Sequence, residues 1–492
     1  MHEHDSDYLI NQLHAVVGQA GLITDSQAQA SYTRDWLGKW QGKVPVVVRP
    51  ASTAETAAVV RVCHETHTPI VTQGGNTGMS GGATPDASGA QVIVSTTRMN
   101  QIRAVDPINN TLTVDAGVIL ARAQEAAKNV DRFFPLSLGA EGSCTVGGNL
   151  ATNAGGIAVL RYGNMRDLVL GLEVVLPDGR IWHGLRGLRK DNTGYDLRGL
   201  FVGSEGTLGI ITGAVLKLFS RLPVRVTAWV GSQSLEQLVI LLARLRERGG
   251  ERLTAFEMMS STSLALVLEH VTQTRSPTTA SFPFNALIEL SDTEDTGLLG
   301  LLESVLSKAM DDGLVSDAVV ASSEAQAAAL WKLREGVSQA QVRAGAVVKH
   351  DIALPISSLA AFVAEADRAV QDAAPMQIST KAGTKSSTAS NASGAATHII
   401  NFGHLGDGNL HYNVLLPGSL SVTEAKHWTL LLNRTVHDLV VSYGGSISAE
   451  HGIGQLRRDE LRRYKTPLEM EMMLCIKRAI DPNQLMNPGK LL

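Results

Sequence analysis

The sequence predicts an α+β fold that is divided into two domains. At 492 residues and 52.3 kDa the chain is longer than one hydrophobic core usually serves. Short β-branched runs alternate with short helical stretches over 41–220, whereas longer helices interleaved with strands follow over 221–455. We therefore expect one domain in each range, a helical lead-in over 1–40, and a C-terminal segment over 456–492 that returns to the first domain.

The composition excludes several classes of protein. Hydrophobic residues make up 44% and charged residues 18% of the chain, and the formal net charge is -4, so nothing favours binding to DNA, RNA or an anionic membrane. Cys63, Cys144 and Cys475 are too dispersed for a disulfide framework or a cysteine zinc site. The N-terminus lacks the features of a signal peptide, and no apolar run approaches the roughly 18 residues that cross a bilayer. We expect a cytoplasmic protein in a reducing compartment.

The first domain opens with a strand, a helix and a second strand. VPVVVRP at 44–50 is typical of a buried strand that ends at a proline. Ser52 and Glu55 predict a capping box, in which Ser52 accepts from the backbone of Glu55 and the Glu55 side chain reaches back. The β-branched residues at 70–72 predict the next strand, which leads into Gly74.

Further strands are expected at 91–95 and 111–115. The segments 168–176 and 180–183 predict a hairpin, because the Asp-Gly pair between them supplies the positive φ that a tight turn needs. All of these short elements belong to the first domain.

The second domain is predicted to contain helices at 234–248 and 298–310 and a strand at 286–290. Residues 373–397 are rich in Ala, Ser, Thr and Gly and carry only two charges. Such a composition buries too little apolar surface to offset the entropy of ordering. We expect this segment to be a mobile surface insertion, and the sequence assigns it no function.

Three glycine-rich loops carry the first functional signal. The loop at 73–82 places five glycines just after a strand, so backbone N–H groups can converge on a phosphate; a plain flexible loop is the alternative. The loop at 135–156 holds six more glycines among Ser, Thr and Asn donors and is long enough to line a dinucleotide. A third loop, 203–209, follows a predicted short helix. None of them fits the nicotinamide-binding GxGxxG or the Walker GxxxxGK[ST] pattern.

Read in order as GGNTGMSGG, TVGGNLATNAGG and VGSEGTLGIIT, these loops resemble the FAD-binding domain of the vanillyl-alcohol oxidase and p-cresol methylhydroxylase (PCMH) flavoproteins. The resemblance covers 41–220 and implies that the first loop binds the FAD pyrophosphate. It also implies that the second loop runs toward the isoalloxazine and that Ile210 and Ile211 lie near the adenine. Some members of the family tether the flavin through a His or Cys near these loops. The first loop has no His, so we expect non-covalent FAD, with a bond to Cys144 of the second loop as the alternative. The FAD contacts implied in this way are Gly74, Gly75, Asn76, Thr77, Gly78, Met79, Gly81, Gly82, Gly139, Gly142, Ser143, Thr145, Gly147, Gly148, Asn149, Thr152, Asn153, Gly155, Gly156, Glu205, Gly206, Gly209, Ile210, Ile211 and Asn487.

The segment NFGHLGDGNLHYN at 401–413 carries the second functional signal. If the Asp-Gly pair at 407–408 forms a two-residue turn, His404 lies directly opposite His411 on one face, with Cβ atoms roughly 5 Å apart. Asn413 falls on the same face. Two imidazoles placed in this way can share a metal ion. Ordinary packing of the two side chains is the alternative.

SAEHGIG at 448–454 offers a carboxylate and an imidazole side by side, Glu450 and His451, in a glycine-flanked loop. Two His and one Glu that leave positions open for substrate form a normal catalytic zinc arrangement. Zn²⁺ is therefore the expected metal, with Mn²⁺ and Fe²⁺ as alternatives.

GHLGDGNLH and EHGIG are similar to motifs of one branch of the flavin family, the FAD-dependent D-2-hydroxyacid dehydrogenases, which include D-lactate and D-2-hydroxyglutarate dehydrogenases. With the FAD loops, the resemblance covers about 45–490. It implies His404, His411 and Glu450 as metal ligands and His451 as the general base. The metal would lower the pKa of the substrate hydroxyl, His451 would take its proton, and the C2 hydride would pass to the flavin.

WKLREGVS at 331–338 and VKHDIALP at 348–355 resemble the D-2-hydroxyglutarate branch, in which an Arg, a hydroxyl residue and a Lys bind the distal carboxylate. Arg supplies a bidentate fork and Lys a point charge. The serine at the middle position keeps the donor that branch members often take from Thr. Solvated surface pairs of the two cations with Glu335 and Asp351 are the alternative. The expected substrate contacts are Arg334, Ser338, Lys349, Asn413 and His451.

Together these features predict a two-domain α+β flavoprotein with a PCMH-type FAD-binding domain, an α+β substrate domain and a metal-assisted site at the domain interface. The expected reaction is oxidation of a D-2-hydroxy dicarboxylate, D-2-hydroxyglutarate first and D-malate second, to the 2-oxo acid. Alternatives are oxidation of D-lactate or glycolate, a metal-dependent hydrolase with vestigial flavin loops, and a catalytically silent flavin-binding subunit. The missing nicotinamide motif argues against NAD and leaves an electron-transfer flavoprotein, a quinone or a soluble carrier as acceptor. The resemblance suggests a homodimer.

Overall fold

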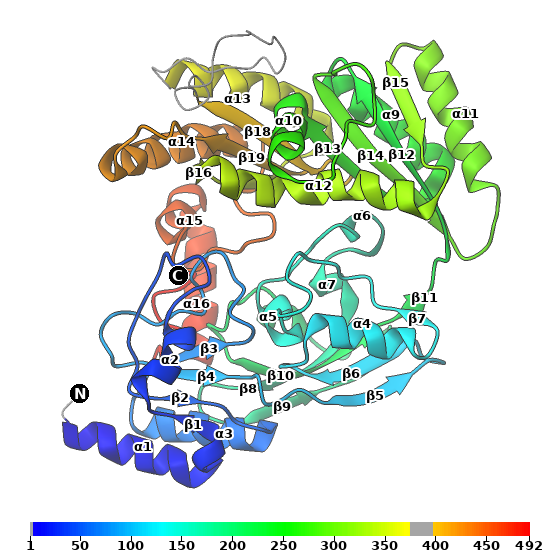
Figure 1. The fold of residues 1–492 in the computed structure, drawn as a ribbon. Coiled ribbons are helices and arrows are strands. Elements are labelled where there is room, and N and C mark those ends of the chain that lie inside the picture. The colour runs from blue at the N-terminus through cyan, green and yellow to red at the C-terminus, as the bar shows by residue number, and fades with distance from the viewer. Residues whose placement is uncertain (1–2, 374–396) are drawn as a thin grey trace. The chain divides into compact units, whose positions relative to one another are not determined.

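Residues from both ends of the chain build the first of two units in the computed structural model, which describes residues 3–373 and 397–492 (Figure 1). Unit 1 comprises Met1–Arg221 and Glu450–Leu492, and unit 2 comprises Leu222–Ala449. The chain returns to unit 1 at Glu450, whereas the sequence analysis placed the start of the C-terminal segment at 456. The predicted insertion over 373–397 lies, apart from its two end residues, outside the described residues.

Unit 1 contains a four-stranded sheet of order β1-β2-β4-β3, a five-stranded sheet of order β5-β6-β10-β8-β9, and the small pair β7 and β11. In the first sheet β2 and β3 both run parallel to β4, whereas the second sheet is antiparallel throughout. The strands are β1 (Leu22–Ile23), β2 (Val47–Val48), β3 (Ile70–Gln73), β4 (Val92–Ser95), β5 (Ile102–Asp106), β6 (Thr111–Asp115), β7 (Arg132–Phe133), β8 (Val169–Val175), β9 (Ile181–Gly184), β10 (Ile210–Lys217) and β11 (Phe219–Ser220). The helices are α1 (Glu3–Val17), α2 (Ser26–Thr33), α3 (Thr53–Glu65), α4 (Leu120–Lys128), α5 (Val146–Ala151), α6 (Val159–Tyr162), α7 (Met165–Leu168), α8 (Arg198–Phe201), α15 (Arg458–Tyr464) and α16 (Pro467–Ile480).

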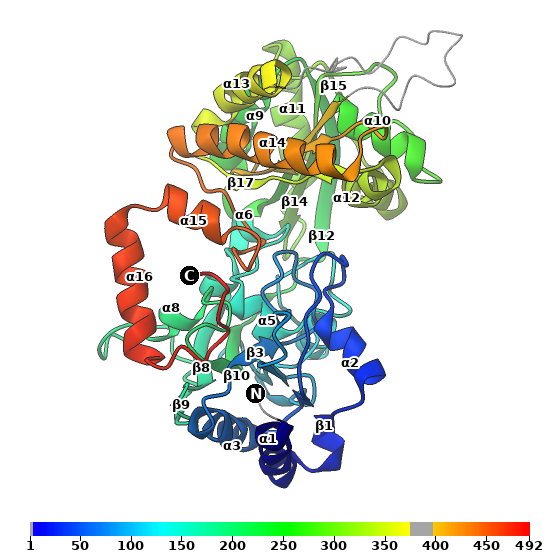
Figure 2. The same ribbon diagram turned by 90° about the vertical axis from the view of Figure 1, so that its left-hand side faces the viewer.

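The N-terminal helix α1 belongs to the core of unit 1. Leu9, Leu13 and Val17 recur every four residues, so they share one helix face, and all three are buried. They join the apolar cluster that includes Val60 and Cys63 of α3. Figures 1 and 2 both show α1 beside α3. The predicted lead-in is thus an integral layer of this unit.

The first predicted strand is shorter than expected. Only Val47–Val48 pairs in a sheet, because the prolines at positions 45 and 50 have no N–H to donate to a neighbouring strand. The predicted helix start is confirmed: the Ser52 side chain accepts from the backbone N–H of Glu55. The Glu55 carboxylate accepts in turn from the backbone of Ala51, 2.7 Å away.

The predicted hairpin of β8 and β9 is confirmed, with Val175 opposite Ile181 and Gly179 at a φ of 81° in the turn. The second predicted glycine loop, 135–156, is not a loop throughout. Residues Val146–Ala151 form the short helix α5, because the Thr145 side chain caps its start by accepting from the backbone N–H of Gly148.

Unit 2 is built on one antiparallel sheet of order β15-β12-β14-β13-β18-β19-β16, with β17 also paired to β19. The strands are β12 (Val224–Ser232), β13 (Leu253–Ser260), β14 (Phe284–Asp292), β15 (Asp317–Val320), β16 (Val347–Val348), β17 (Asp351–Ala353), β18 (His398–His404) and β19 (Asn409–Leu415). The helices are α9 (Leu235–Gly249), α10 (Ser261–His270), α11 (Leu298–Asp311), α12 (Glu324–Ala344), α13 (Leu359–Ala373) and α14 (Val422–Ser442). The predicted helices at 234–248 and 298–310 and the strand at 286–290 are confirmed.

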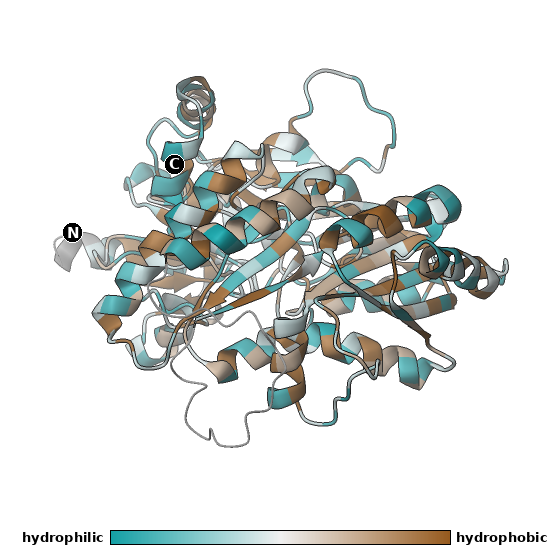
Figure 3. Ribbon diagram, turned by 90° about the horizontal axis from the view of Figure 1, so that it is seen from above, coloured by the Kyte–Doolittle hydropathy of each residue, from teal (hydrophilic) through white to brown (hydrophobic). Residues whose placement is uncertain are grey.

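Helices pack on the unit 2 sheet through apolar faces. Residues of α10 and α12, such as Val267 and Leu333, cluster with Trp229 and Phe402 from the strands. In Figure 3 brown and teal residues alternate along the helices, the pattern expected when one face of a helix is apolar. Across residues 3–373 and 397–492, no helix is both long and apolar enough to cross a membrane.

Candidate functional site

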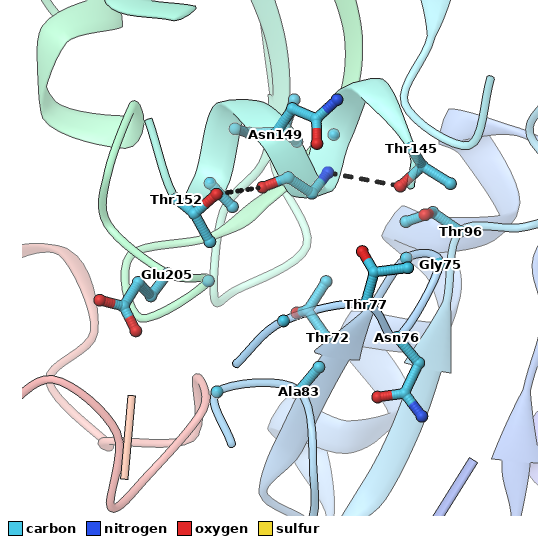
Figure 4. Close-up of a pocket in the computed structure, with 18 of the residues that line it drawn as sticks. Thr72, Gly75, Asn76, Thr77, Ala83, Thr96, Thr145, Asn149, Thr152 and Glu205 are labelled. Atoms are coloured by element: carbon cyan, nitrogen blue, oxygen red, sulfur yellow. Dashed lines mark hydrogen bonds between the residues drawn. The ribbon is translucent and has the colours of Figure 1, made fainter. Parts of the chain in front are cut away.

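The three glycine-rich loops meet at one pocket of unit 1 (Figure 4). The pocket is open to solvent, and the empty space within it is about 950 Å³ with the open solvent included. Its lining residues are Thr72, Gly74, Gly75, Asn76, Thr77, Gly78, Ser80, Gly82, Ala83, Thr96, Thr145, Gly147, Gly148, Asn149, Ala151, Thr152, Ser204, Glu205, Gly206, Gly209, Ile211 and His451.

Most residues that were predicted to contact FAD line this pocket. The predicted residues that lie elsewhere in the described part of unit 1 are Met79, Gly81, Gly139, Gly142, Ser143, Asn153, Gly155, Gly156, Ile210 and Asn487. Ile210 points into the apolar core instead. Further lining residues that were not predicted are Thr72, Ser80, Ala83, Thr96, Ala151 and Ser204. Thr72 lies near the end of β3, which leads into the first loop, and Thr96 directly follows β4, which pairs with β3; these positions were the signal available for them.

Glycine is required where the first two loops touch. A Cβ on Gly74 would lie 2.2 Å from the Thr145 hydroxyl oxygen, and one on Gly75 would lie 2.0 Å from the Ser143 carbonyl oxygen. Any side chain there would push the loops apart. Part of the glycine pattern therefore serves contact between loops rather than contact with a ligand.

Glu205 ties the third loop to the C-terminal loop. Its carboxylate accepts from the backbone N–H groups of Ile453 and Gly454, each 2.7 Å away. Burial raises the pKa of Glu205, and these two N–H groups and nearby Arg457 offset only part of that rise. Asn487 also links these loops, because its side-chain amide donates to the carbonyls of Gly82 and Glu205.

The predicted catalytic loop also lies at this pocket. His451 is one of the lining residues, and its carbonyl accepts from the Ser80 hydroxyl at 3.0 Å. The neighbouring Glu450 carboxylate accepts from the backbone N–H of Gly156 at 2.7 Å. Unit 1 thus brings the predicted base to the three loops, although the chain separates Ser80 from His451 by 371 residues.

The pocket offers donors that suit a polar cofactor such as FAD. Among the described residues, the hydroxyl oxygens of Thr72 and Thr96 are buried without a hydrogen-bond partner, and both residues line the pocket. Buried polar atoms of this kind are costly unless a ligand or water satisfies them. The thiol of Cys144, the alternative point for a covalent bond to the flavin, is buried, and burial raises its pKa.

In unit 2 the histidine hairpin has a different register from the predicted one. Residues 405–408 form a four-residue turn, so His404 opposes Asn409, and His411 opposes Phe402. The two-residue turn fails because the Asp407 backbone N–H donates to the His404 carbonyl and its carboxylate accepts from the Asn409 N–H. The prediction that His404 lies directly opposite His411 is therefore wrong.

The two imidazoles nevertheless share one face of the hairpin as diagonal neighbours, because residues two apart in a strand point the same way. The ring centroids of His404 and His411 are 5.7 Å apart. A ring nitrogen of one lies within 4.8 Å of a ring nitrogen of the other, close enough for both to bind one ion.

Two buried carboxylates lie near these imidazoles. Glu257 of β13 lies with Oε1 2.8 Å from Nδ1 of His404, and Asp351 of β17 lies with Oδ1 3.8 Å from Nδ1 of His411. Burial alone would raise the pKa of Glu257, but attraction to His404 and Arg334 outweighs it and holds that pKa below its usual value. Glu257 was not predicted as a site residue, because its only signal in the sequence is a lone acid within an apolar run.

Arg334 is not a surface residue. It is 7% exposed, and its Nε and Nη2 lie 2.8 and 2.7 Å from Oε2 of Glu257. Its guanidinium also lies over the ring of Phe402. The alternative of a solvated pair with Glu335 is therefore wrong. Asp351 is fully buried, so it is not a solvated partner for Lys349 either.

The other predicted substrate contacts differ in their surroundings. Ser338 lies one turn after Arg334 on α12 and is exposed, and Lys349 is half-buried just before β17. The Asn413 amide is engaged at both ends: its oxygen accepts from the backbone of His350, and its nitrogen donates to Gln341.

Comparison with known families agrees with this arrangement of an FAD-type pocket and a histidine hairpin. Residues 44–184 match the "FAD binding domain" family, and residues 221–491 match the "FAD linked oxidases, C-terminal domain" family. The chain belongs to the FAD-linked oxidase family of flavoprotein oxidoreductases.

The chain is similar to several D-2-hydroxyglutarate dehydrogenases. It is 38% identical over 473 residues to the mitochondrial enzyme of Danio rerio, covering 96% of this chain and 82% of that protein. It is 36% identical to the probable mitochondrial enzyme of Oryza sativa subsp. indica, covering 98% and 81%. It is 35% identical to the enzyme of Xanthomonas citri pv. viticola, covering 99% and 97%.

Solved structures confirm the predicted PCMH-type fold. p-Cresol methylhydroxylase with substrate bound superposes with a TM-score of 0.75 at 17% identity, over 99% of this chain and 97% of that one. Alkyldihydroxyacetonephosphate synthase superposes with a TM-score of 0.70 at 18% identity, over 98% and 84%.

Proposed function

We propose that this protein is an FAD-dependent dehydrogenase that oxidises D-2-hydroxyglutarate to the 2-oxo acid. The observation that carries the proposal is that His451 lines the same pocket as the three glycine-rich loops. A base at the flavin site is what oxidation of a secondary alcohol requires. The similarity to D-2-hydroxyglutarate dehydrogenases over nearly the whole chain supports the choice of substrate.

FAD would be held without a covalent bond and would accept the hydride from C2 of the substrate. The backbone of the first loop and the Thr72 and Thr96 hydroxyls would supply its donors. Cys144 supports non-covalent binding, because its thiol is buried and does not belong to the described pocket lining. His451 would take the proton of the substrate hydroxyl.

His404 and His411 would bind a divalent metal, most simply Zn²⁺, with Glu450 as the third ligand predicted from the sequence. The shared face and close nitrogens of the two imidazoles support this role. The Glu257 carboxylate, 2.8 Å from Nδ1 of His404, supports it further, because metal-binding imidazoles usually donate their other N–H to such a partner. Zn²⁺, Mn²⁺ and Fe²⁺ all accept such ligands.

Arg334, Ser338 and Lys349 would bind the distal carboxylate of the substrate. Glu257 already neutralises much of the Arg334 charge. Lys349 would add a second positive charge for the substrate carboxylate. D-Malate, which also has two carboxylates, would be the second substrate.

The remaining proposals concern partners. Electrons would pass to an electron-transfer flavoprotein or a quinone, because no nicotinamide motif occurs in the sequence. The working enzyme would be a homodimer. Oxidation of D-lactate is the second candidate activity, and it predicts that replacing Lys349 leaves kcat/KM unchanged.

The test is anaerobic stopped-flow reduction of the flavin by D-2-hydroxyglutarate in the wild type and in His451→Gln. Loss of a general base slows the step about 10²- to 10⁴-fold. His183→Gln is the control, because His183 lies in the same unit and is not part of the pocket lining. Wild-type reduction in the His451 variant with normal FAD content would refute the proposed base.

A further inference from the structure

Two buried carboxylates flank the hairpin histidines from opposite sides of the strand pair. Glu257 lies on β13, which pairs with β18, the strand of His404. Asp351 lies on β17 and is the direct register partner of His411 on β19. Each histidine therefore has an acid on the neighbouring strand: Glu257 lies within hydrogen-bond distance of Nδ1 of His404, whereas Asp351 lies 3.8 Å from Nδ1 of His411.

A carboxylate beside Nδ1 determines which nitrogen of the imidazole can bind a metal. A carboxylate beside Nδ1 keeps the proton on that nitrogen, so the lone pair that remains is on Nε2. The same contact fixes the rotation of the ring about its bond to Cβ. An imidazole held in this way is a more basic and better aimed ligand than a free one.

Glu257 is itself held in place. Oε1 contacts His404, and Oε2 accepts from Arg334, so both carboxylate oxygens are used. Glu257 is 1% exposed, and a charge buried this deeply needs such partners to remain stable. The Arg334 guanidinium in turn lies over Phe402, whose ring centroid is 4.8 Å from that of His411.

Asp351 is similarly fixed but lies farther from its histidine. It is fully buried and accepts from the Asn409 side chain at 3.0 Å. Its oxygen is 3.8 Å from Nδ1 of His411, against 2.8 Å for Glu257 and His404. Glu257 should therefore constrain its imidazole more strongly than Asp351 does.

We propose that Glu257 and Asp351 are positioning residues that orient His404 and His411 so that Nε2 of each binds the metal. The inference rests on the metal site of the proposed function and adds the two residues that hold its histidine ligands in position. Neither acid is expected to touch the substrate or the flavin. Their effect should therefore appear first in metal affinity.

The test is Zn²⁺ affinity of the purified holoenzyme, measured by competition with a chromophoric chelator. Glu257→Gln keeps the size of the side chain and removes the charge, and it should weaken Zn²⁺ binding 10- to 100-fold, the usual effect of losing an outer partner. Asp351→Asn should weaken it less. In the Co²⁺-loaded protein both variants should also change the visible absorption of the metal, which a purely structural role would not do.

The chain offers a matched control in unit 1. Glu173 is also buried, and it contacts Arg103 at 2.9 Å and Nδ1 of His183 at 3.1 Å, the same trio of residue types. Glu173→Gln should lower thermal stability without changing Zn²⁺ affinity. Equal loss of Zn²⁺ affinity in this control and in Glu257→Gln would overturn the inference, because the effect would then be general destabilisation.

His404→Ala distinguishes an error in the proposed metal site from an error in the proposed positioning role. If it leaves Zn²⁺ affinity unchanged, the metal site of the proposed function is wrong. If it abolishes binding while Glu257→Gln and Asp351→Asn both bind Zn²⁺ like the wild type, the site stands and the positioning role is wrong. If Glu257→Gln fails to fold, Asp351→Asn decides by the same criteria, since Asn can still accept from the Asn409 side chain.

Discussion

Replacing Gly75 by alanine should force the first two glycine-rich loops apart where they touch and weaken FAD binding. The new Cβ would lie 2.0 Å from the Ser143 carbonyl oxygen, and ordinary contact begins at 3.4 Å, so the two loops must separate by up to 1.4 Å (3.4 minus 2.0). The obstacle is backbone rather than a side-chain end, so no rotamer change removes it. Overpacking of this kind costs about 1–3 kcal/mol.

If that cost falls on the closed, FAD-binding arrangement of the loops, the Kd for FAD rises about 5- to 140-fold, at 1.4 kcal/mol per factor of ten. The assay is titration of the apoprotein with FAD, followed by quenching of flavin fluorescence. Gly142→Ala is the matched control, because a Cβ there meets no atom within 4 Å of the described structure, and Gly142 does not line the pocket. A wild-type Kd in Gly75→Ala would refute the reasoning, and a weakened Kd in the control would show that Gly142 binds FAD after all.

Three further outcomes are expected. Lys349→Met should raise the KM for D-2-hydroxyglutarate about tenfold or more and leave turnover of D-lactate unchanged, since only D-2-hydroxyglutarate has a distal carboxylate. Equal effects on the two substrates in steady-state assays would contradict the proposal that Lys349 binds that carboxylate. Of the three thiols, only exposed Cys475 should react quickly with a thiol reagent at pH 8, because burial raises the pKa of Cys63 to about 12 and also raises that of Cys144; labelling followed by peptide mass mapping tests this. Although burial opposes it, hydrogen bonds from Thr53 and Arg103 hold the pKa of Glu173 below its usual value, so its stabilisation is present at neutral pH and lost as pH falls through that lowered pKa. The difference in Tm between wild type and Glu173→Gln should therefore shrink on acidification, and a difference independent of pH would contradict the ion-pair account.

Local features of the fold were predictable because their causes are local. The Ser52 cap and the turn at Gly179 depend on residues within a few positions of each other, so the pattern alone identified them. The glycine loops were recognised for the same reason. The strand at 44–50 is shorter than predicted, because the prolines at positions 45 and 50 cannot donate to a neighbouring strand.

Features that depend on distant residues were predicted less well. The register of the histidine hairpin changed because one side chain, Asp407, captured a backbone N–H, a choice that the Asp-Gly pair does not specify. Glu257 contacts His404 across 147 residues of sequence, and no local pattern indicates that their strands pair. The burial of Arg334 follows from the same pairing. The alternative of a solvated surface pair for Arg334 could therefore be dismissed only once the sheet was known.

The most direct test of the proposed activity is an anaerobic visible spectrum of the purified protein, titrated with D-2-hydroxyglutarate, its L-enantiomer and D-lactate. We predict that D-2-hydroxyglutarate bleaches the flavin, that the L-enantiomer does not, and that chelation abolishes bleaching until a divalent metal is restored. A yellow protein that D-2-hydroxyglutarate does not bleach, with or without added metal, would contradict the proposed function.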